Sequence, residues 1–558
     1  MPIKRPAWAA PGDVNAFFGL MLDNIADLLL TVSLLTGVFA FPTEVALRYM
    51  IPGTAVGVLV GDLLFFWLAL KLAAKTGRGD ITAMPLGLDT PSTFGMVFFV
   101  LGPAFVAGKA AGMNEHDAAI HTWHIGICSI FISGLFKIAC SLGSHWIRRL
   151  FPRAGLLGSL TAVALVLISF LPLLEILHLP LVGFVALAVV LTTLIARVPL
   201  PFKIPGALGS LLVAGTLYYV MQALQGSAGF PEFLKLPPVS VEFKPEQAML
   251  PWEWITAFKF QWLGAMRQTL PYLPIVIPFA LGTVVGGIDC TESAAAAGDE
   301  YDTSTVIGIE AVATLAASLC GGVIQTTPYI GHPAYKAMGG RAAYALATAI
   351  FVGTAGLIGY FGYLYVYIPK PTVFPILIFV GLEITAQSFY ATPKRHYPAV
   401  ALACVPALAV LALMYVDKML ALGANIAGTP MEAEVHTLRI LANGFIVTSL
   451  LWASALAALI DQKLWRAAAF FAVCAMLTAF GIMHSPAPGS PLFLPWETGE
   501  PLIATTPRFL GFVPSLMFQQ VAPYIAGYLF VSLLLLLWGG YLMLTGGNVP
   551  TPAAEESE

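Results

Sequence analysis

Long apolar runs separated by short polar stretches make up most of this chain. An apolar run of about 20 residues forms a helix that can cross a hydrocarbon core of roughly 30 Å. The pattern therefore predicts an all-α polytopic membrane protein. Sixteen apolar segments lie near residues 17–40, 51–74, 90–108, 120–142, 155–177, 181–197, 204–224, 270–297, 304–323, 328–338, 342–368, 371–389, 397–416, 437–460, 465–483 and 521–545.

Two of these segments, beginning at 90 and 328, are short and interrupted. Each lies at a polar stretch that contains proline and glycine, 82–91 in the first half of the chain and 326–333 in the second. Irregular backbone at membrane depth is tolerated only where protein or a water-filled cavity satisfies its N–H and C=O groups. A matched pair of such interruptions points to the binding site of an inverted-repeat secondary transporter. We expect a half-helix preceded by extended backbone at each place.

The two halves of the chain repeat one order of features. A helix with intramembrane acids comes first, followed by a Gly/Ala-rich helix, the interrupted segment, a plain helix and a proline-led helix. Each half has seven segments, and an odd number starts the second copy on the opposite side of the membrane. The order predicts a seven-plus-seven inverted repeat, followed by two extra C-terminal helices.

Composition agrees with a membrane protein. The chain is 58% hydrophobic and only 10% charged, whereas soluble domains contain about 25% charged residues. The net charge of −3, without a basic tract, gives no indication of a nucleic-acid partner. The six cysteines lack metal-ligand spacing, so we expect small buried hydrophobic side chains there, with no metal or cofactor.

Basic residues gather at alternate ends of the segments. The positive-inside rule then places both termini in the cytoplasm of a multi-pass protein of the cell (inner or plasma) membrane. The polar N-terminus lacks a cleavable signal pattern, so the first apolar segment is expected to stay in the bilayer. The basic clusters assigned to the cytoplasm lie at 4–5, 71–78, 148–153, 197–203, 336–341, 394–395 and 463–466.

Acidic residues inside the apolar segments are the main candidates for function. Each costs at least about 2.5–3.5 kcal/mol at the centre of a membrane helix. Asp23 and Asp27 are four residues apart and share a helix face, which is compatible with either a structural or a coupling role. Asp289 and Glu292 are three apart, again on one face, and we assign them a substrate or proton role. Asp62, which follows Gly61, is interpreted as a partner for the backbone of a neighbouring helix.

The interrupted segments add polar groups of their own. Asp89 lies in the first interruption and His332 in the second, where a capping role and a ligand contact are both open. Two half-helix starts near the midplane offer N–H donors for carbonyl or anionic oxygens. Further candidates for hydrogen bonding and stacking are Thr90, Ser92, Phe94, Gln325, Thr326, Thr327 and Tyr329. We expect Asp299, Glu300 and Asp302 to lie in a solvated turn.

Several short motifs resemble the nucleobase–ascorbate transporter family, the nucleobase:cation symporters that include xanthine/uracil permeases. The similarity covers roughly residues 15–460 and is carried by Phe18-Gly-Leu-Met-Leu-Asp23, the acid-bearing eighth segment, Gly321 with Gln325-Thr-Thr, Gly339-Gly-Arg341 and Ile368-Pro-Lys-Pro. The chain departs from the family where an acid follows Thr-Thr-Tyr. Pro328 interrupts that motif and Ile330 or Gly331 stands in the place of the acid, which leaves His332 or Asp89 to take part of its role.

The resemblance implies a division into a core domain that holds the solute and a gate domain, often in a homodimer, with elevator-like alternating access. It also implies that Glu292, or Asp289 in another register, binds the substrate. The implied boundaries are a cytoplasmic N-terminus at 1–16, core parts at 17–142 and 266–368, gate parts at 155–224 and 369–460, an extracytoplasmic loop at 225–265, extra helices at 461–545 and a cytoplasmic tail at 546–558.

These features favour a secondary active transporter that takes up a nucleobase, such as a purine, or a related heterocycle with a proton or sodium ion. Asp23, Asp27 and Glu292 are the candidates for coupling. The alternative is a carrier or exchanger of a small anion, such as sulfate or bicarbonate, on the same fold. Paired acids oppose a bare anion site unless protons or sodium neutralise them. No nucleophile–base pair or phosphate loop is evident, so enzymatic activity is not expected.

Overall fold

The computed structural model describes residues 8–142, 152–201, 204–227, 230–236, 243–329, 331–487, 492–496 and 514–545. The predicted cytoplasmic tail at 546–558, the first seven residues of the predicted N-terminal segment, and Ile330 lie outside this part of the chain. The described chain is helical apart from one sheet of two short strands.

The first half of the chain contains the elements that precede the long loop. They are α1 (Gly12–Phe39), α2 (Thr43–Val45) leading through a π-helical turn into α3 (Ile51–Thr76), β1 (Leu86–Leu88), α4 (Thr90–Met96) continuing into α5 (Gly102–Ala110), α6 (Glu115–Ser141), α8 (Arg153–Val163) continuing into α9 (Phe170–Ile176), α10 (Pro180–Val190) and α11 (Gly206–Leu224).

The second half follows short 3-10 turns between 232 and 265. Its elements are α12 (Met266–Thr269), α13 (Leu273–Ala296), α14 (Thr303–Leu319), β2 (Thr326–Pro328), α15 (His332–Ala337), α16 (Ala343–Ile358), α17 (Phe361–Tyr367), α18 (Lys370–Tyr390), α19 (Tyr397–Ala421), α20 (Pro430–Ala442), α21 (Phe445–Ile460), α22 (Leu464–Ala479) and α23 (Leu516–Thr545).

All sixteen predicted segments coincide with helices. Ten described helices are long and apolar enough to cross a membrane, and two bent pairs, α16 with α17 (89°) and α20 with α21 (72°), raise the number to 12. Three shorter apolar helices and the six-residue α15 account for the remaining predicted segments. Seven segments precede the loop, seven follow it and two come last, so the chain has the seven-plus-seven architecture with two additional helices.

The inverted relation between the halves is visible in the sheet. β1 pairs antiparallel with β2, with Leu86 opposite Pro328 and Leu88 opposite Thr326. Each strand comes directly before its half-helix, α4 after β1 and α15 after β2. Because the strands run in opposite directions, the two half-helices leave the sheet on opposite sides. The expected extended stretch before each half-helix is confirmed.

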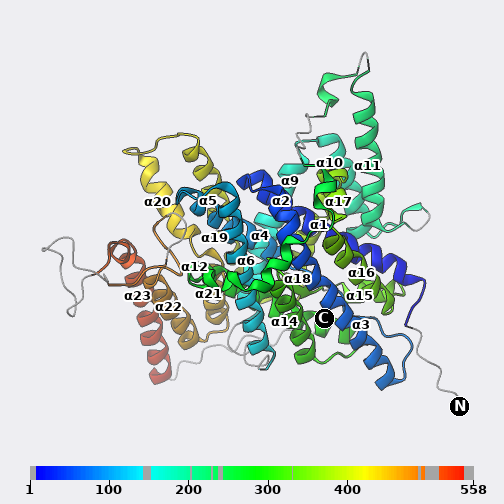
Figure 1. The fold of residues 1–558 in the computed structure, drawn as a ribbon. Helices are drawn as coiled ribbons and strands as arrows, with labels where there is room; N and C mark the ends of the chain where they lie inside the picture. Colours follow the sequence, from blue (N-terminus) through cyan, green and yellow to red (C-terminus); the bar gives the residue numbers. More distant parts are fainter. Residues whose placement is uncertain are drawn as a thin grey trace. The chain divides into compact units, whose positions relative to one another are not determined.

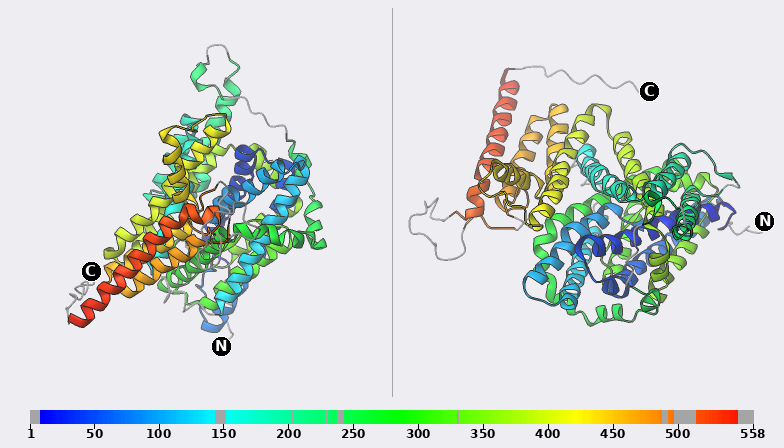
Figure 2. Two further views of the ribbon diagram at one scale, coloured as in Figure 1. Left: turned by 90° about the vertical axis from the view of Figure 1, so that its left-hand side faces the viewer. Right: turned by 90° about the horizontal axis from the view of Figure 1, so that it is seen from above.

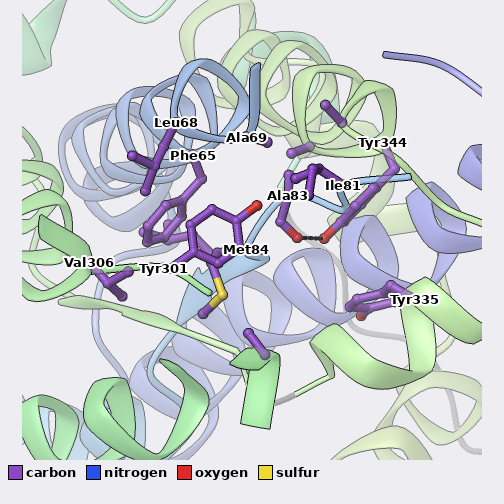
Figure 3. Close-up of a cluster of buried hydrophobic side chains, with 14 of the residues drawn as sticks. Phe65, Leu68, Ala69, Ile81, Ala83, Met84, Tyr301, Val306, Tyr335 and Tyr344 are labelled. Atoms are coloured by element: carbon purple, nitrogen blue, oxygen red, sulfur yellow. Dashed lines mark hydrogen bonds between the residues drawn. The ribbon is translucent and has the colours of Figure 1, made fainter. Parts of the chain in front are cut away.

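The chain divides into two compact units. The first comprises residues 1–145 and 168–381. Within it, α3 packs against α14 and α16, and α14 packs against α6 (Figure 1). An apolar cluster that includes Phe65, Met84 and Tyr335 surrounds the chain entering β1. In Figure 3 the hydroxyl of Tyr344 points at the carbonyl oxygen of Ala83, to which it donates a 2.7 Å hydrogen bond.

The second unit comprises residues 146–167 and 382–558, and includes the two extra helices. Here α8, α19 and α21 pack together, and α22 packs against α21 and α23. The orange α22 lies beside the red α23 in Figure 2. The hydroxyl of Tyr528 on α23 is 2.7 Å from Nε2 of His484 and accepts a 2.8 Å hydrogen bond from Trp452 on α21. The extra helices are therefore joined to α21 by a polar contact as well as by apolar packing. The core, gate and cytoplasmic assignments made above stay predictions.

Candidate functional site

The crossing of β1 and β2 is the centre of the candidate site. Hydrogen bonds extend the pairing beyond the strands, because Asp89 N donates to Gln325 O (3.1 Å) and Tyr329 N donates to Pro85 O (2.8 Å). The two interruptions found in the sequence thus touch each other over their whole extended length. Residues 85–89 and 325–329, called the crossing below, form one structural feature.

Side chains from α1 and α3 satisfy backbone groups of β1. Asp62 accepts a 3.1 Å hydrogen bond from Leu86 N through Oδ1. Asn24 accepts one from Leu88 N (3.1 Å), and its amide donates to Leu86 O (3.4 Å). Such partners are required because a strand within lipid has no water to bond its N–H and C=O groups. The structural interpretation of Asp62 agrees with this contact.

The start of α4 is held by two carboxylates. Asp89 caps the helix by accepting a 3.0 Å hydrogen bond from Ser92 N, as expected for an acid at a helix N-terminus. Thr90 Oγ1 donates to Oδ2 of Asp27 at 2.8 Å. Asp27 is fully buried and Asp23 is 6% exposed. Both predicted α1 acids are buried in the helix that packs on β1 and α4.

The β2 side of the crossing contains a buried charge pair that the sequence analysis overlooked. Lys137 on α6 lies 2.7 Å from Glu310 on α14, and neither side chain is exposed. Lys137 Nζ also donates to Thr326 O at 2.9 Å. Gln325 Oε1 accepts from Ser133, also on α6, and its amide lies 3.4 Å from Asp89. The sequence did contain a signal for this pair. A charged residue interrupts each of two apolar runs, at Phe-Lys-Ile and at Ile-Glu-Ala.

The remaining predicted site residues lie at varied depths. Phe94 is fully buried and stacks on Phe98. Thr327, Tyr329 and Asp289 are half-buried, whereas Glu292 is exposed near the end of α13. The structure thus brings Asp89, Thr90, Gln325 and Thr326 together at the crossing, with Asp27 bonded to Thr90. Glu292 lies at an exposed position of α13.

His332 belongs to a second polar cluster, around Asp299. Its Nε2 is 3.1 Å from Thr82 O and 3.3 Å from Asp299. Asp299 is fully buried and also contacts Lys336 and Arg78. The expectation that Asp299 is solvated is therefore wrong, because the turn folds back onto α15 and the chain entering β1. Glu300 and Asp302 are exposed as expected, and Asp302 accepts hydrogen bonds from Thr305, which lower its pKa.

The charge balance at the crossing is acidic. Four carboxyl groups around the crossing are buried, those of Asp27, Asp62, Asp89 and Glu310, whereas Lys137 supplies the one buried ammonium group among the residues described there and contacts Glu310. Within the described chain, no group of three or more His, Cys, Asp or Glu side chains has the arrangement of a metal site. Oxygen-rich surroundings with one cation can accept a proton or a monovalent cation, and can accept an anion only when such a cation accompanies it.

No family model matches the chain, and no curated protein matches it. Similar solved structures include the transmembrane domain of a cyanobacterium bicarbonate transporter, BicA, at 15% identity and TM-score 0.44, covering 74% of this chain and 97% of that one. The overall structure of SLC26A9 is similar at 12% identity and TM-score 0.44, covering 71% and 61%. The murine Slc26a9 anion transporter in its inward-facing state is similar at 13% identity and TM-score 0.37, covering 73% and 68%.

BicA is described as a bicarbonate transporter and murine Slc26a9 as an anion transporter, which are properties of those proteins. At this identity and these TM-scores the likeness assigns no solute to the present chain, and its fold class stands on its own elements. The resemblance to nucleobase–ascorbate transporters stays a prediction.

Proposed function

We propose that the chain is a secondary active transporter in which a small anion binds at the crossing together with a proton or sodium ion. The observation that supports this most directly is the buried Lys137 ammonium, 2.9 Å from Thr326 O, beside two interrupted membrane helices. Interrupted helices at the midplane are typical of solute sites in inverted-repeat transporters. A buried cation with carboxylates around it gives an anion one attractive partner and requires a second cation for balance.

The crossing is closed in this conformation. Lys137, Asp27 and Thr326 are all fully buried, so a solute reaches them only after the surrounding helices move. This agrees with an alternating-access transporter rather than a continuously open channel. Elevator-like movement and a homodimer remain parts of the proposal. Asp23, Asp27 and Glu310 are the buried carboxylates available to the accompanying cation, while the exposed Glu292 is the remaining coupling candidate.

A nucleobase is the second candidate solute. Gln325 and the half-buried Thr327 and Tyr329 offer the uncharged donors, acceptors and ring that a heterocycle requires. Against it, Phe94, the stacking partner expected in the first interruption, is fully buried against Phe98. The buried Lys137 ammonium is also better matched by a charged anion than by an uncharged ring, whose carbonyl oxygens accept only a hydrogen bond. We therefore prefer the anion.

Uptake by purified protein in proteoliposomes distinguishes the two solutes. We expect saturable uptake of at least one of radiolabelled sulfate, nitrate or bicarbonate, and no uptake of xanthine or uracil. Lys137→Gln is expected to abolish anion uptake, whereas the matched variant Lys75→Gln, at an exposed position of α3, is expected to retain it. Saturable uptake of xanthine or uracil without uptake of any of these anions would overturn the proposal.

A further inference from the structure

The Lys137–Glu310 pair is unusual among the ion pairs of the described chain. Its two charged atoms are 2.7 Å apart and both side chains are fully buried, whereas the other Lys or Arg pairs with Asp or Glu involve at least one exposed or partly exposed side chain. Burying two charges is costly, and a hydrophobic pair of similar volume often stabilises a protein as well. The pair is therefore expected to have a role besides stability.

The pair lies against the second interrupted segment. Lys137 donates to Thr326 O, and Oγ1 of Thr314, one turn after Glu310 on α14, is 3.2 Å from Oγ1 of Thr326. Carboxylate Oε2 of Glu310 lies close to Gly287 of α13, since a β-carbon there would be 3.0 Å from it. Glu310 thus stands where α6, α13, α14 and β2 meet.

The charges of this pair impose a condition on an incoming anion. With Glu310 ionised, lysine and glutamate sum to zero, and a monovalent anion makes the buried group net negative. With Glu310 protonated and no anion, the group is net positive. With both proton and anion bound, it is again neutral. Net charge in a low-dielectric interior is strongly unfavourable, so each ligand favours the binding of the other.

We propose that Glu310 accepts the proton that accompanies the anion, and that its protonation releases the Lys137 ammonium to pair with that anion. This inference rests on the proposed function and names its coupling ion. One proton adds to a carboxylate oxygen of Glu310, the Lys137–Glu310 ion pair opens, and the ammonium stays charged throughout. Release of the anion on the other side restores the ion pair and expels the proton, which makes transport of a monovalent anion electroneutral.

The other groups that face Glu310 are consistent with this role. Asp89 at the start of α4, Cys140 on α6 and Cys290 on α13 all interact with it electrostatically. Asp62 on α3 accepts a hydrogen bond from Leu86 N. Asp89, at the start of α4, accepts one from Ser92 N. Both thiols are ordinarily uncharged at neutral pH. Glu310 is therefore the carboxylate in direct contact with the ammonium that binds the anion.

The test uses nitrate as a monovalent probe and measures binding by thermal shift between pH 5 and 8. For the unchanged protein we expect nitrate affinity to rise as the pH falls, by up to about tenfold per pH unit. External nitrate should also acidify the interior of proteoliposomes. Glu310→Gln is expected to bind nitrate with the same affinity at every pH, to exchange internal for external nitrate, and to move no protons. Glu175→Gln, an exposed carboxylate on α9, is the matched control and should behave as the unchanged protein.

A double variant separates coupling from folding. Lys137→Gln with Glu310→Gln leaves no unpaired buried charge, so it should unfold near the temperature of the unchanged protein while binding no nitrate. If Glu310→Gln keeps the full pH dependence and proton uptake, the inference is wrong. If the unchanged protein transports an anion with sodium and without protons, the inference fails while the proposed function stands. If it binds none of nitrate, sulfate and bicarbonate at any pH, both fail.

Discussion

Lys336 on α15 and Asp299 in the α13–α14 connection form a close ion pair, with Nζ 2.5 Å from Oδ1. Asp299 also accepts a 3.0 Å hydrogen bond from Thr82 N and lies 3.2 Å from Arg78. A single buried carboxylate thus joins the chain that enters β1 to the half-helix that follows β2. Asp299 therefore anchors the start of the first interrupted segment and the half-helix that follows the second.

Asp299→Asn should therefore destabilise the protein by roughly 3 kcal/mol at neutral pH, because it leaves neighbouring positive charges without their partner. Burial alone would raise the pKa of Asp299, but hydrogen bonds from His332 and Lys336 outweigh it and hold the pKa below its ordinary value. A lowered pKa in the folded state stabilises the protein above the unfolded pKa, and the benefit is lost as the pH falls through the folded one. The difference in unfolding temperature between the two proteins should shrink below about pH 4. A difference that does not change with pH would contradict this assignment.

The hydrogen bond between Thr90 and Asp27 gives a second prediction. A hydrogen bond typically contributes about 0.5–1.5 kcal/mol, and Thr90 donates to Oδ2 of Asp27, whereas Oδ1 has no hydrogen-bond partner among the residues described. Thr90→Val and Asp27→Ala should each lower thermal stability and anion uptake, and the double variant should lose less than the sum of the two. Thr122→Val, which removes a hydroxyl bonded to its own helix at Ala118 O, is the control. Additive losses would show that the contact is not formed.

The acids of α13 are expected to differ from each other. Asp289 is half-buried and adjoins Cys290, whose thiol donates to Pro328 O, whereas Glu292 is exposed. Asp289→Asn should lower the rate of uptake in proteoliposomes several-fold more than Glu292→Gln, since a group that faces solvent contributes less to a buried site. A larger effect of Glu292→Gln would place the solute nearer the end of α13 and support the role expected from the family resemblance.

A close helix approach beside the crossing supplies a prediction about the fold. A methyl group on Gly53 of α3 would lie 2.2 Å from the backbone nitrogen of Gly322, which leads into β2. Gly53→Ala should therefore destabilise the protein by about 1–3 kcal/mol, the usual cost of overpacking. Gly37→Ala on α1 is the control, because nothing lies within 4 Å of the added carbon, and it should be neutral or slightly stabilising. Equal thermal stability of both variants and the unchanged protein would contradict the close approach.

Much of the architecture was predictable because it depends on local pattern. The length of apolar runs is set by the bilayer, and Pro and Gly in 82–91 and 326–333 break helices wherever they occur. The extended stretches before both half-helices followed from these residues alone. Which acids are buried did not follow, because Asp289 and Glu292 share a helix face yet differ in burial.

The sequence by itself determined the membrane class, the sixteen segments and the positions of the two interruptions, since each depends on residues adjacent in the chain. Only the tertiary structure decided that Lys137 meets Glu310, that Asp299 is buried, and that Asp27 bonds Thr90. Lys137 and Glu310 are 173 positions apart in the chain, and Asp27 and Thr90 are 63 positions apart. Burial and charge pairing depend on which helices pack together. The hydrophobic periodicity of a single segment does not determine which other helix it packs against.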